Sequence, residues 1–356
     1  MRKWWLFFLS LVCLIVLGAC SSGQSSTSTS GSDAAEDSEQ NSETSGTEEE
    51  KLEEPIVIEH AFGETVIESK PERVATVQWG NQDVALAMGV MPAGFSAANY
   101  GVTNEEGMLP WTEEKVKELG GDPTVYQDTD GLDFEAVSDT NPDVILAAYS
   151  GITQEDYDTL SKIAPVVAYP ESPWTTPWRE QIRMNAKGMA MEEEGEQLIK
   201  DTEQLISEKT AEYPEMKGKK VVWANFSADD MSELHLYTPA DTRVSFLTEE
   251  LGMQYPESVK NLIEDESSFS LSLSAENADV LNDADIIIGY GDESLYEAVK
   301  ADPRLGRIDA IERGSVAFIG DGTALAASGT PTPLSISYTI DDYLGLIGDA
   351  ISQIDE

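Results

Sequence analysis

The stretch NPDVILAAYSGITQEDYDTLSKIAPVVAYP, residues 141–170, contains two short apolar runs separated by a polar segment of helical character. Residues 71–95, PERVATVQWGNQDVALAMGVMPAGF, repeat the order of strand, loop, helix and strand. Strands that alternate with helices indicate a parallel sheet covered on both faces. We therefore expect an α/β fold in this part of the chain.

The segments around this core extend the same pattern. Residues 54–69, EPIVIEHAFGETVIES, alternate apolar and polar side chains around Phe62-Gly63, which predicts a β-hairpin. Residues 177–213 keep a helical spacing of apolar residues and predict one long helix that joins two lobes. A second α/β series follows. Its expected strands are 217–227, 284–292 and 314–320, and its expected helices are 241–252, 293–300 and 333–354.

Two segments resemble each other. Residues 132–151 and 273–292 each contain a glutamate near the start of a helical turn, Glu135 and Glu276. Each then has an aspartate before an apolar strand that ends in a tyrosine. The repeat predicts two similar lobes with a cleft between them.

The N-terminal segment has the parts of an export signal: a basic start, an apolar run from Trp4 to Leu17, and small residues before Cys20. The run is shorter than the roughly 20 residues that span a bilayer. LGAC at 17–20 resembles the bacterial lipobox, which implies that Cys20 carries lipid. The Ser-, Thr- and Glu-rich segment after it predicts a disordered acidic tether.

These observations divide the chain into five parts. They are a lipoprotein signal peptide (1–19), the lipidated cysteine and tether (20–54), an N-terminal lobe (55–176), the interlobe helix (177–213), and a C-terminal lobe with a closing helix (214–356).

The composition excludes several classes of function. A formal charge of −45 argues against nucleic acid and against electrostatic binding to anionic lipid. The chain has only two histidines, His60 and His235, which disfavours a receptor for bare Zn(II) or Mn(II). No motif of a hydrolase or metalloprotease is present, so we expect a protein that is not an enzyme and has no cofactor.

The lipobox, tether, hairpin, two α/β series and connecting helix together resemble the iron-siderophore receptors of ABC importers. Their branch of the periplasmic-binding-protein-like family also includes receptors for ferric hydroxamates, ferric citrate and vitamin B12. The resemblance covers residues 55–355. It implies two Rossmann-like lobes of the class III fold and a monomer that is anchored by lipid at the outer face of the cell membrane, as in Gram-positive bacteria. It also implies a ferric siderophore as ligand, delivered to a permease with its ATPase.

The resemblance and the expected strand ends together suggest the site residues. Ligands of open α/β sheets lie beyond the carboxyl ends of strands. Aromatic side chains at these ends would bury the apolar faces of a siderophore. Arginines would donate hydrogen bonds to its iron-bound oxygens. The expected ligand-binding residues are Trp79, Asn81, Tyr149, Trp178, Arg179, Trp223, Tyr237, Arg243 and Tyr290. In the family, one exposed glutamate in each lobe pairs with permease arginines, which suggests this role for Glu135 and Glu276. The siderophore itself would hold the iron.

Other ligands remain open. Cobalamin would suit a large cleft with few charges, whereas an arginine-containing pocket favours a siderophore. Haem also remains open despite the small number of histidines, because a tyrosine can ligate ferric haem. An exported enzyme and an adhesin are the alternatives from other classes.

Overall fold

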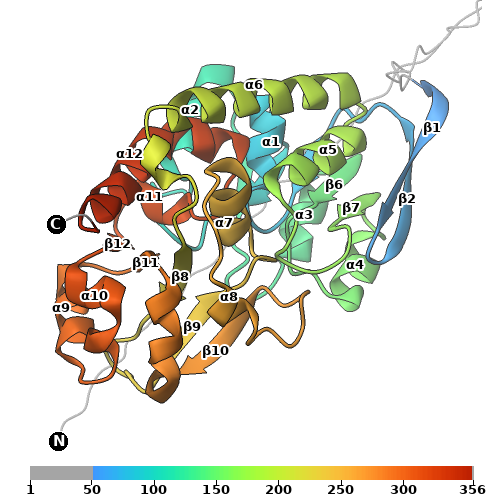
Figure 1. Ribbon diagram of the computed structural model, residues 1–356. Coiled ribbons are helices and arrows are strands. Elements are labelled where there is room, and N and C mark those ends of the chain that lie inside the picture. The colour runs from blue at the N-terminus through green and yellow to red at the C-terminus, as the bar shows by residue number, and fades with distance from the viewer. Residues whose placement is uncertain (1–50, 355–356) are drawn as a thin grey trace, which may run out of the picture. The chain divides into compact units, whose positions relative to one another are not determined.

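The computed structural model describes residues 51–354 (Figure 1). The signal peptide, Cys20 and the tether up to residue 50 lie outside the described residues. Within residues 51–354, no helix is both long enough and apolar enough to cross a membrane.

The domain opens with the predicted hairpin, β1 (Lys51–His60) paired antiparallel with β2 (Gly63–Ser69). The prediction that the tether runs to residue 54 was wrong in its last residues, because β1 begins at Lys51 and Leu52 packs against the core. Thr65 of β2 fastens the hairpin to the first sheet, because its hydroxyl donates to the carbonyl of Val166 in β7. His60 Nε2 lies 2.9 Å from the same hydroxyl.

The first sheet is parallel throughout, as predicted, with strand order β5-β4-β3-β6-β7. Its strands are β3 (Val74–Thr76), β4 (Gly94–Ser96), β5 (Thr124–Tyr126), β6 (Val144–Ala147) and β7 (Val166–Ala168). Its helices are α1 (Asn81–Ala87), α2 (Pro110–Leu119), α3 (Phe134–Asp139) and α4 (Gln154–Leu160).

The second sheet has the equivalent order, β10-β9-β8-β11-β12, but β9 runs antiparallel to both of its neighbours. Its strands are β8 (Val221–Asn225), β9 (Glu233–Tyr237), β10 (Ser270–Ser274), β11 (Ile286–Tyr290) and β12 (Val316–Ile319). Its α-helices are α7 (Thr242–Ser245), α8 (Glu257–Lys260), α9 (Glu293–Ala301), α10 (Asp309–Arg313), α11 (Ala324–Ala327) and α12 (Pro333–Ser352). Three 3-10 segments, η1 (Pro214–Met216), η3 (Ala275–Asp283) and η4 (Leu305–Arg307), and one π-helical segment, η2 (Phe246–Glu250), complete this half.

The sequence repeat has a structural cause. Asp143 directly precedes β6, and its carboxylate accepts the backbone N–H groups of Glu72 and Arg73 at the start of β3. Asp285 directly precedes β11, and its carboxylate accepts the N–H of Lys220 just before β8. Each aspartate therefore joins the central strand of its sheet to the next strand, β6 or β11, at their amino ends.

The prediction of one helix over residues 177–213 was wrong. The segment forms α5 (Trp178–Gly188) and α6 (Glu192–Thr210), which pack against each other (Figure 1). Ala190 adopts a left-handed backbone conformation with φ of 53°, which ends the first helix. Three glutamates, residues 192–194, occupy the first turn of α6, where the helix dipole favours negative charge.

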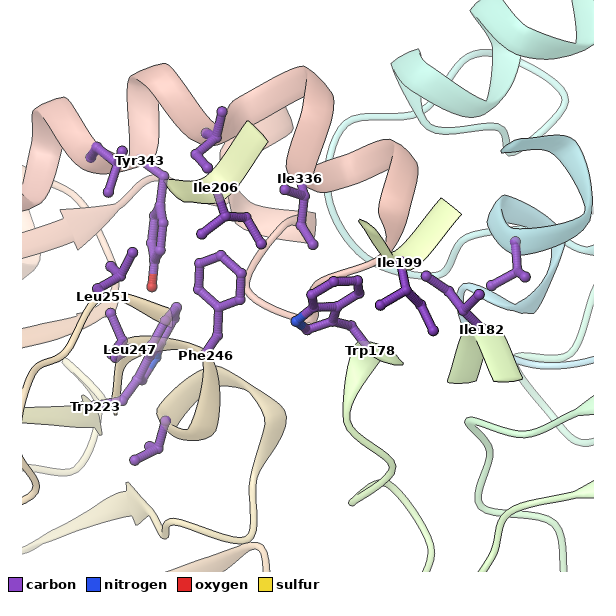
Figure 2. Packing of buried hydrophobic residues seen from close by; sticks show 14 of the residues in the cluster. Trp178, Ile182, Ile199, Ile206, Trp223, Phe246, Leu247, Leu251, Ile336 and Tyr343 are labelled. Atoms are coloured by element: carbon purple, nitrogen blue, oxygen red, sulfur yellow. The ribbon is translucent and has the colours of Figure 1, made fainter. Parts of the chain in front are cut away.

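One hydrophobic cluster joins the two sheets. It combines Trp178 of α5, Ile199 and Ile206 of α6 and Tyr343 of α12 with residues of both α/β series, including Trp223 of β8 (Figure 2). Helix α12 closes the chain, as predicted, but it also packs on α1 and α2 of the first half. The two halves therefore share one continuous core.

A buried carboxylate ties the closing helix to the first half. Asp83 of α1 is 1% exposed. It accepts hydrogen bonds from Trp111 Nε1 (2.8 Å) and Thr112 Oγ1 (2.9 Å) of α2 and from Thr332 Oγ1 (2.7 Å), the N-cap of α12. Burial raises the pKa of Asp83 from 3.8 to about 6, and the three hydrogen bonds offset only part of this effect.

The position of Asp83 predicts a pH dependence of stability. Because its pKa is higher in the folded protein, its contribution to stability is present below pH 3.8 and is lost as the pH rises through about 6. We expect wild-type protein to lose about 3 kcal/mol relative to Asp83→Asn between pH 3 and 7. Urea unfolding of both proteins across this range measures the difference, and a difference that stays constant with pH would contradict the assignment.

Candidate ligand-binding site

A cavity of about 370 Å³ lies between residues of the two halves, within the size range of small-molecule sites. Its lining comes from both α/β series. The lining residues are Gln78, Trp79, Ser96, Ala97, Asn99, Tyr100, Asp128, Tyr149, Trp174, Tyr237, Asp241, Arg243, Phe269, Tyr290, Ala326, Ala327 and Thr330.

The first half contributes the loops that follow its parallel strands. Gln78 follows β3 and has a left-handed backbone with φ of 60°. Its N–H donates to Ser96 Oγ (2.7 Å) at the end of β4 and to Asp128 Oδ2 (3.3 Å) after β5. Its side-chain oxygen accepts the N–H of Gly151, after β6, at 2.6 Å. These bonds hold an unfavourable conformation in place and connect four strand ends.

Aromatic side chains form much of the wall. Tyr149 and Trp174 meet edge to face with ring centroids 5.4 Å apart. Trp174 also has a left-handed backbone, with φ of 64°, and its indole lies over Gly151. A Cβ at residue 151 would be 2.3 Å from Trp174 Nε1, so glycine is required for this approach.

Tyr100 connects the two halves beside the cavity. Its hydroxyl donates to Asp321 Oδ1 at 2.9 Å, and its ring contacts Tyr290 edge-on at 5.3 Å between centroids. Burial raises the pKa of the Tyr100 phenol, so this hydroxyl stays protonated at neutral pH and acts as a donor.

Arg243 is the cation of the cavity wall. Its Nε donates to the Tyr290 hydroxyl (3.0 Å), and its Nη1 donates to both carboxylate oxygens of Asp241 (3.2 and 3.0 Å). The guanidinium lies 4.4 Å from the centroid of the Tyr237 ring, which favours a cation at this position. Nη2 has no hydrogen-bond acceptor among residues 51–354, so it remains available to a ligand.

Burial sets the ionisation of the groups around Arg243. It raises the pKa of Asp241, although the neighbouring guanidinium offsets part of the effect. Burial also raises the pKa of Tyr149 to about 12. Tyr149 is therefore a neutral hydrogen-bonding group at physiological pH.

The structure brings five of the nine suggested ligand-binding residues to the cavity wall. They are Trp79, Tyr149, Tyr237, Arg243 and Tyr290. The remaining four lie elsewhere.

Asn81 and Trp223 are buried behind the wall. The Asn81 amide donates to the carbonyls of Val77 and Tyr149 and accepts the N–H of Tyr149, so it fixes the turn after β3. Trp223 lies within β8 rather than at its end and is 0% exposed. Its ring contacts Tyr237 and Tyr290, with centroid distances of 6.4 and 5.4 Å. Both residues position side chains of the site from behind.

Trp178 and Arg179 lie away from the cavity at the start of α5. Trp178 Nε1 donates to Glu250 Oε1 at 3.1 Å. Arg179 pairs with Glu250 and with Glu203, whose Oε1 is 2.6 Å from Arg179 Nε. These bonds use the guanidinium to connect α5, α6 and η2, so Arg179, an expected ligand-binding residue at the start of this helical segment, does not line the cavity.

Sequence reasoning missed several lining residues. Tyr100, Trp174 and Phe269 lie in loops, where no strand or helix periodicity indicates which residues face a cavity. The available signal for them was an aromatic side chain within a polar segment. Asp128 and Asp241 are two carboxylates in a chain with 67 acidic residues, so their types alone did not distinguish them.

Glu135 and Glu276 occupy equivalent exposed positions in the first turns of α3 and η3. Each turn has a side-chain cap: Asp133 accepts the N–H of Ala136, and Ser274 accepts the N–H of Glu276. Neither glutamate has a salt-bridge partner among the described residues.

Comparisons with known proteins identify relatives over most of the chain. A family described as periplasmic binding protein matches residues 74–322. The crystal structure of PiaA from Streptococcus pneumoniae TIGR4 in complex with ferrichrome is 56% identical, covers 84% of this chain and 99% of its own, and superimposes with a TM-score of 0.81.

Two curated proteins of Bacillus subtilis (strain 168) are more distant. The probable siderophore-binding lipoprotein YfiY is 25% identical over 80% of this chain and 78% of its own length. The Fe(3+)-citrate-binding protein YfmC is 24% identical over 86% of each chain. These relatives are binding proteins rather than enzymes. The predicted resemblance and its two-lobed α/β fold are thus confirmed: the chain belongs to the periplasmic binding protein family.

Proposed function

We propose that this chain is the substrate-binding lipoprotein of an ABC importer for ferric siderophores. The ligand occupies the aromatic cavity around Arg243, and ferric trihydroxamates are the favoured class. The protein acts as a monomer tethered through lipidated Cys20 to the outer face of the cell membrane, and it passes its ligand to a permease with an ATPase.

The fixed geometry of Arg243 carries this proposal. Two of its nitrogens are held by Asp241 and Tyr290, and its face rests on Tyr237, so the remaining Nη2 has a defined direction. A guanidinium donates strong hydrogen bonds to negatively charged oxygens, including hydroxamate oxygens already bound to Fe(III). Its immobilisation by the protein reduces the entropy lost on binding.

The charges of the wall favour hydroxamates over more anionic ligands. Three hydroxamates neutralise Fe(III), whereas a ferric tris-catecholate carries three negative charges. The cavity presents one arginine, and two carboxylates, Asp128 and Asp241, also line it. A trianionic complex would therefore meet repulsion in the cavity as well as from a chain of charge −45. The bound ferrichrome of the 56% identical PiaA supports the same class.

Haem and cobalamin are less compatible with this cavity. A tyrosine that ligates ferric haem must lose its proton, and burial raises the pKa values of Tyr149 and Tyr290. Neither His60 nor His235 lines the cavity. The aromatic wall is narrowed by the contact between Tyr100 and Tyr290, which disfavours a ligand as large as cobalamin.

The two exposed glutamates suit the permease contact. Glu135 and Glu276 lie at equivalent positions of the repeat, and neither carboxylate forms a salt bridge within residues 51–354, although Arg304 lies near Glu276. Two arginine-bearing sites on a permease could pair with them simultaneously, and two weak contacts together give a higher effective affinity.

The role of Arg243 predicts the result of a binding titration. Ferrichrome should quench the tryptophan fluorescence of the wild-type protein, while haemin and cobalamin should not. Arg243→Lys keeps the positive charge but loses the planar guanidinium and the fixed directions of its N–H donors. We expect about a 30-fold loss of ferrichrome affinity, equivalent to about 2 kcal/mol. Arg183→Ala, an exposed arginine of α5, is the control and should bind normally. Quenching by haemin or cobalamin alone would reject the proposal.

The glutamate pair predicts a separation of binding from transport. Glu135→Lys combined with Glu276→Lys should leave ferrichrome affinity unchanged and abolish uptake of ⁵⁵Fe-ferrichrome by cells, because like charges would then face the permease. The matched control reverses Glu155 and Glu293, which are exposed in the first turns of α4 and α9. Normal uptake by the first variant, or loss of uptake by the control, would contradict the docking role.

A further inference from the structure

Asp128 is a carboxylate of the cavity wall without a cationic partner. Its Oδ2 accepts the hydroxyl of Ser96 and the N–H of Gln78, and its Oδ1 faces the N–H of Asp133 at 3.5 Å. All three donors are neutral. Within residues 51–354, no lysine, arginine or histidine forms a salt bridge with it.

Asp241 differs from Asp128 in this respect. It is 1% exposed, and Arg243 neutralises it at 3.0 Å. The charged side chains that line the cavity are therefore one paired arginine, its partner Asp241, and an unpaired Asp128. With both aspartates ionised, the wall has a net charge of −1, which resides on the side of the first sheet.

The surroundings of Asp128 would strengthen its interaction with a cation. The carboxylate is half-buried, and burial raises its pKa because water no longer solvates the charge fully. A cationic group beside it would compensate that loss. Trp79, Tyr149 and Trp174 line the same cavity, and their ring faces attract cations as well.

We propose that Asp128 forms a subsite for a positively charged arm of the ligand, so that the protein prefers ferric trihydroxamates with a free ammonium group over neutral ones. This inference rests on the proposed function. Arg243 then contacts the iron-bound oxygens from the second half, and Asp128 distinguishes among complexes of the same class by the charge of their periphery.

A matched pair of ligands tests the subsite. Ferrioxamine B carries a terminal ammonium, and its N-acetylated derivative has the same iron centre without the charge. We expect the wild-type protein to bind ferrioxamine B about tenfold more tightly, with the preference reduced at high salt. Asp128→Asn keeps the acceptor for Ser96 and Gln78 but removes the charge. The Asp128→Asn variant should abolish the preference, because it should weaken the binding of ferrioxamine B and leave the binding of the N-acetylated derivative unchanged.

The control is Asp130→Asn, which removes the same charge from an exposed residue of the same loop that does not line the cavity. It should retain the tenfold preference, and thermal unfolding should show that both variants are folded. The subsite proposal would be overturned if the wild-type protein bound the two ligands with equal affinity. It would also be overturned if Asp128→Asn lowered the affinity for both ligands equally. Failure of the wild-type protein to bind either ligand or ferrichrome would instead reject the proposed function.

Discussion

The hydrophobic contact between α6, α12 and the two α/β series holds both sheets in one core. Ile199 and Ile206 of α6 pack with Ile336 and Tyr343 of α12 in a cluster that reaches into both halves (Figure 2). Because packed cores resist deformation, this cluster limits how far the two sheets can move independently. A cavity whose walls come from both sheets therefore keeps much of its geometry before a ligand arrives.

The same core continues to the surface of the site. Trp223 is part of the cluster and supports the rings of Tyr237 and Tyr290 from behind. Tyr237 in turn supports the guanidinium of Arg243, which Asp241 and Tyr290 orient. A partly buried arginine is thus held through an uninterrupted series of contacts that begins in the interior. The orientation of Arg243 at the cavity therefore depends on the packing of Trp223, which does not itself line the cavity.

The sequence allowed the sheets, the hairpin and five wall residues to be predicted, because strands alternating with helices place residues such as Trp79 and Tyr149 at one edge of a sheet. Three features depended on information that periodicity does not carry. In β9, polar and apolar residues alternate only over Glu233–Tyr237. This stretch is too short to distinguish a strand from a loop in the sequence. The break between α5 and α6 rests on the backbone of Ala190, a residue type that normally favours helix. Asp128 became distinctive only when tertiary structure showed which carboxylates have partners.

The contact of Tyr100 with Asp321 and Tyr290 has a kinetic consequence. It joins the two halves beside the cavity through one partly exposed hydrogen bond and one ring contact. Such a bond contributes about 1 kcal/mol, so thermal motion opens it in a substantial fraction of molecules. Side-chain rearrangements of this kind take nanoseconds, far less than the interval between encounters with a scarce ligand. Opening of the Tyr100 contact is therefore faster than ligand arrival, so under the proposed function this contact does not limit the rate of capture.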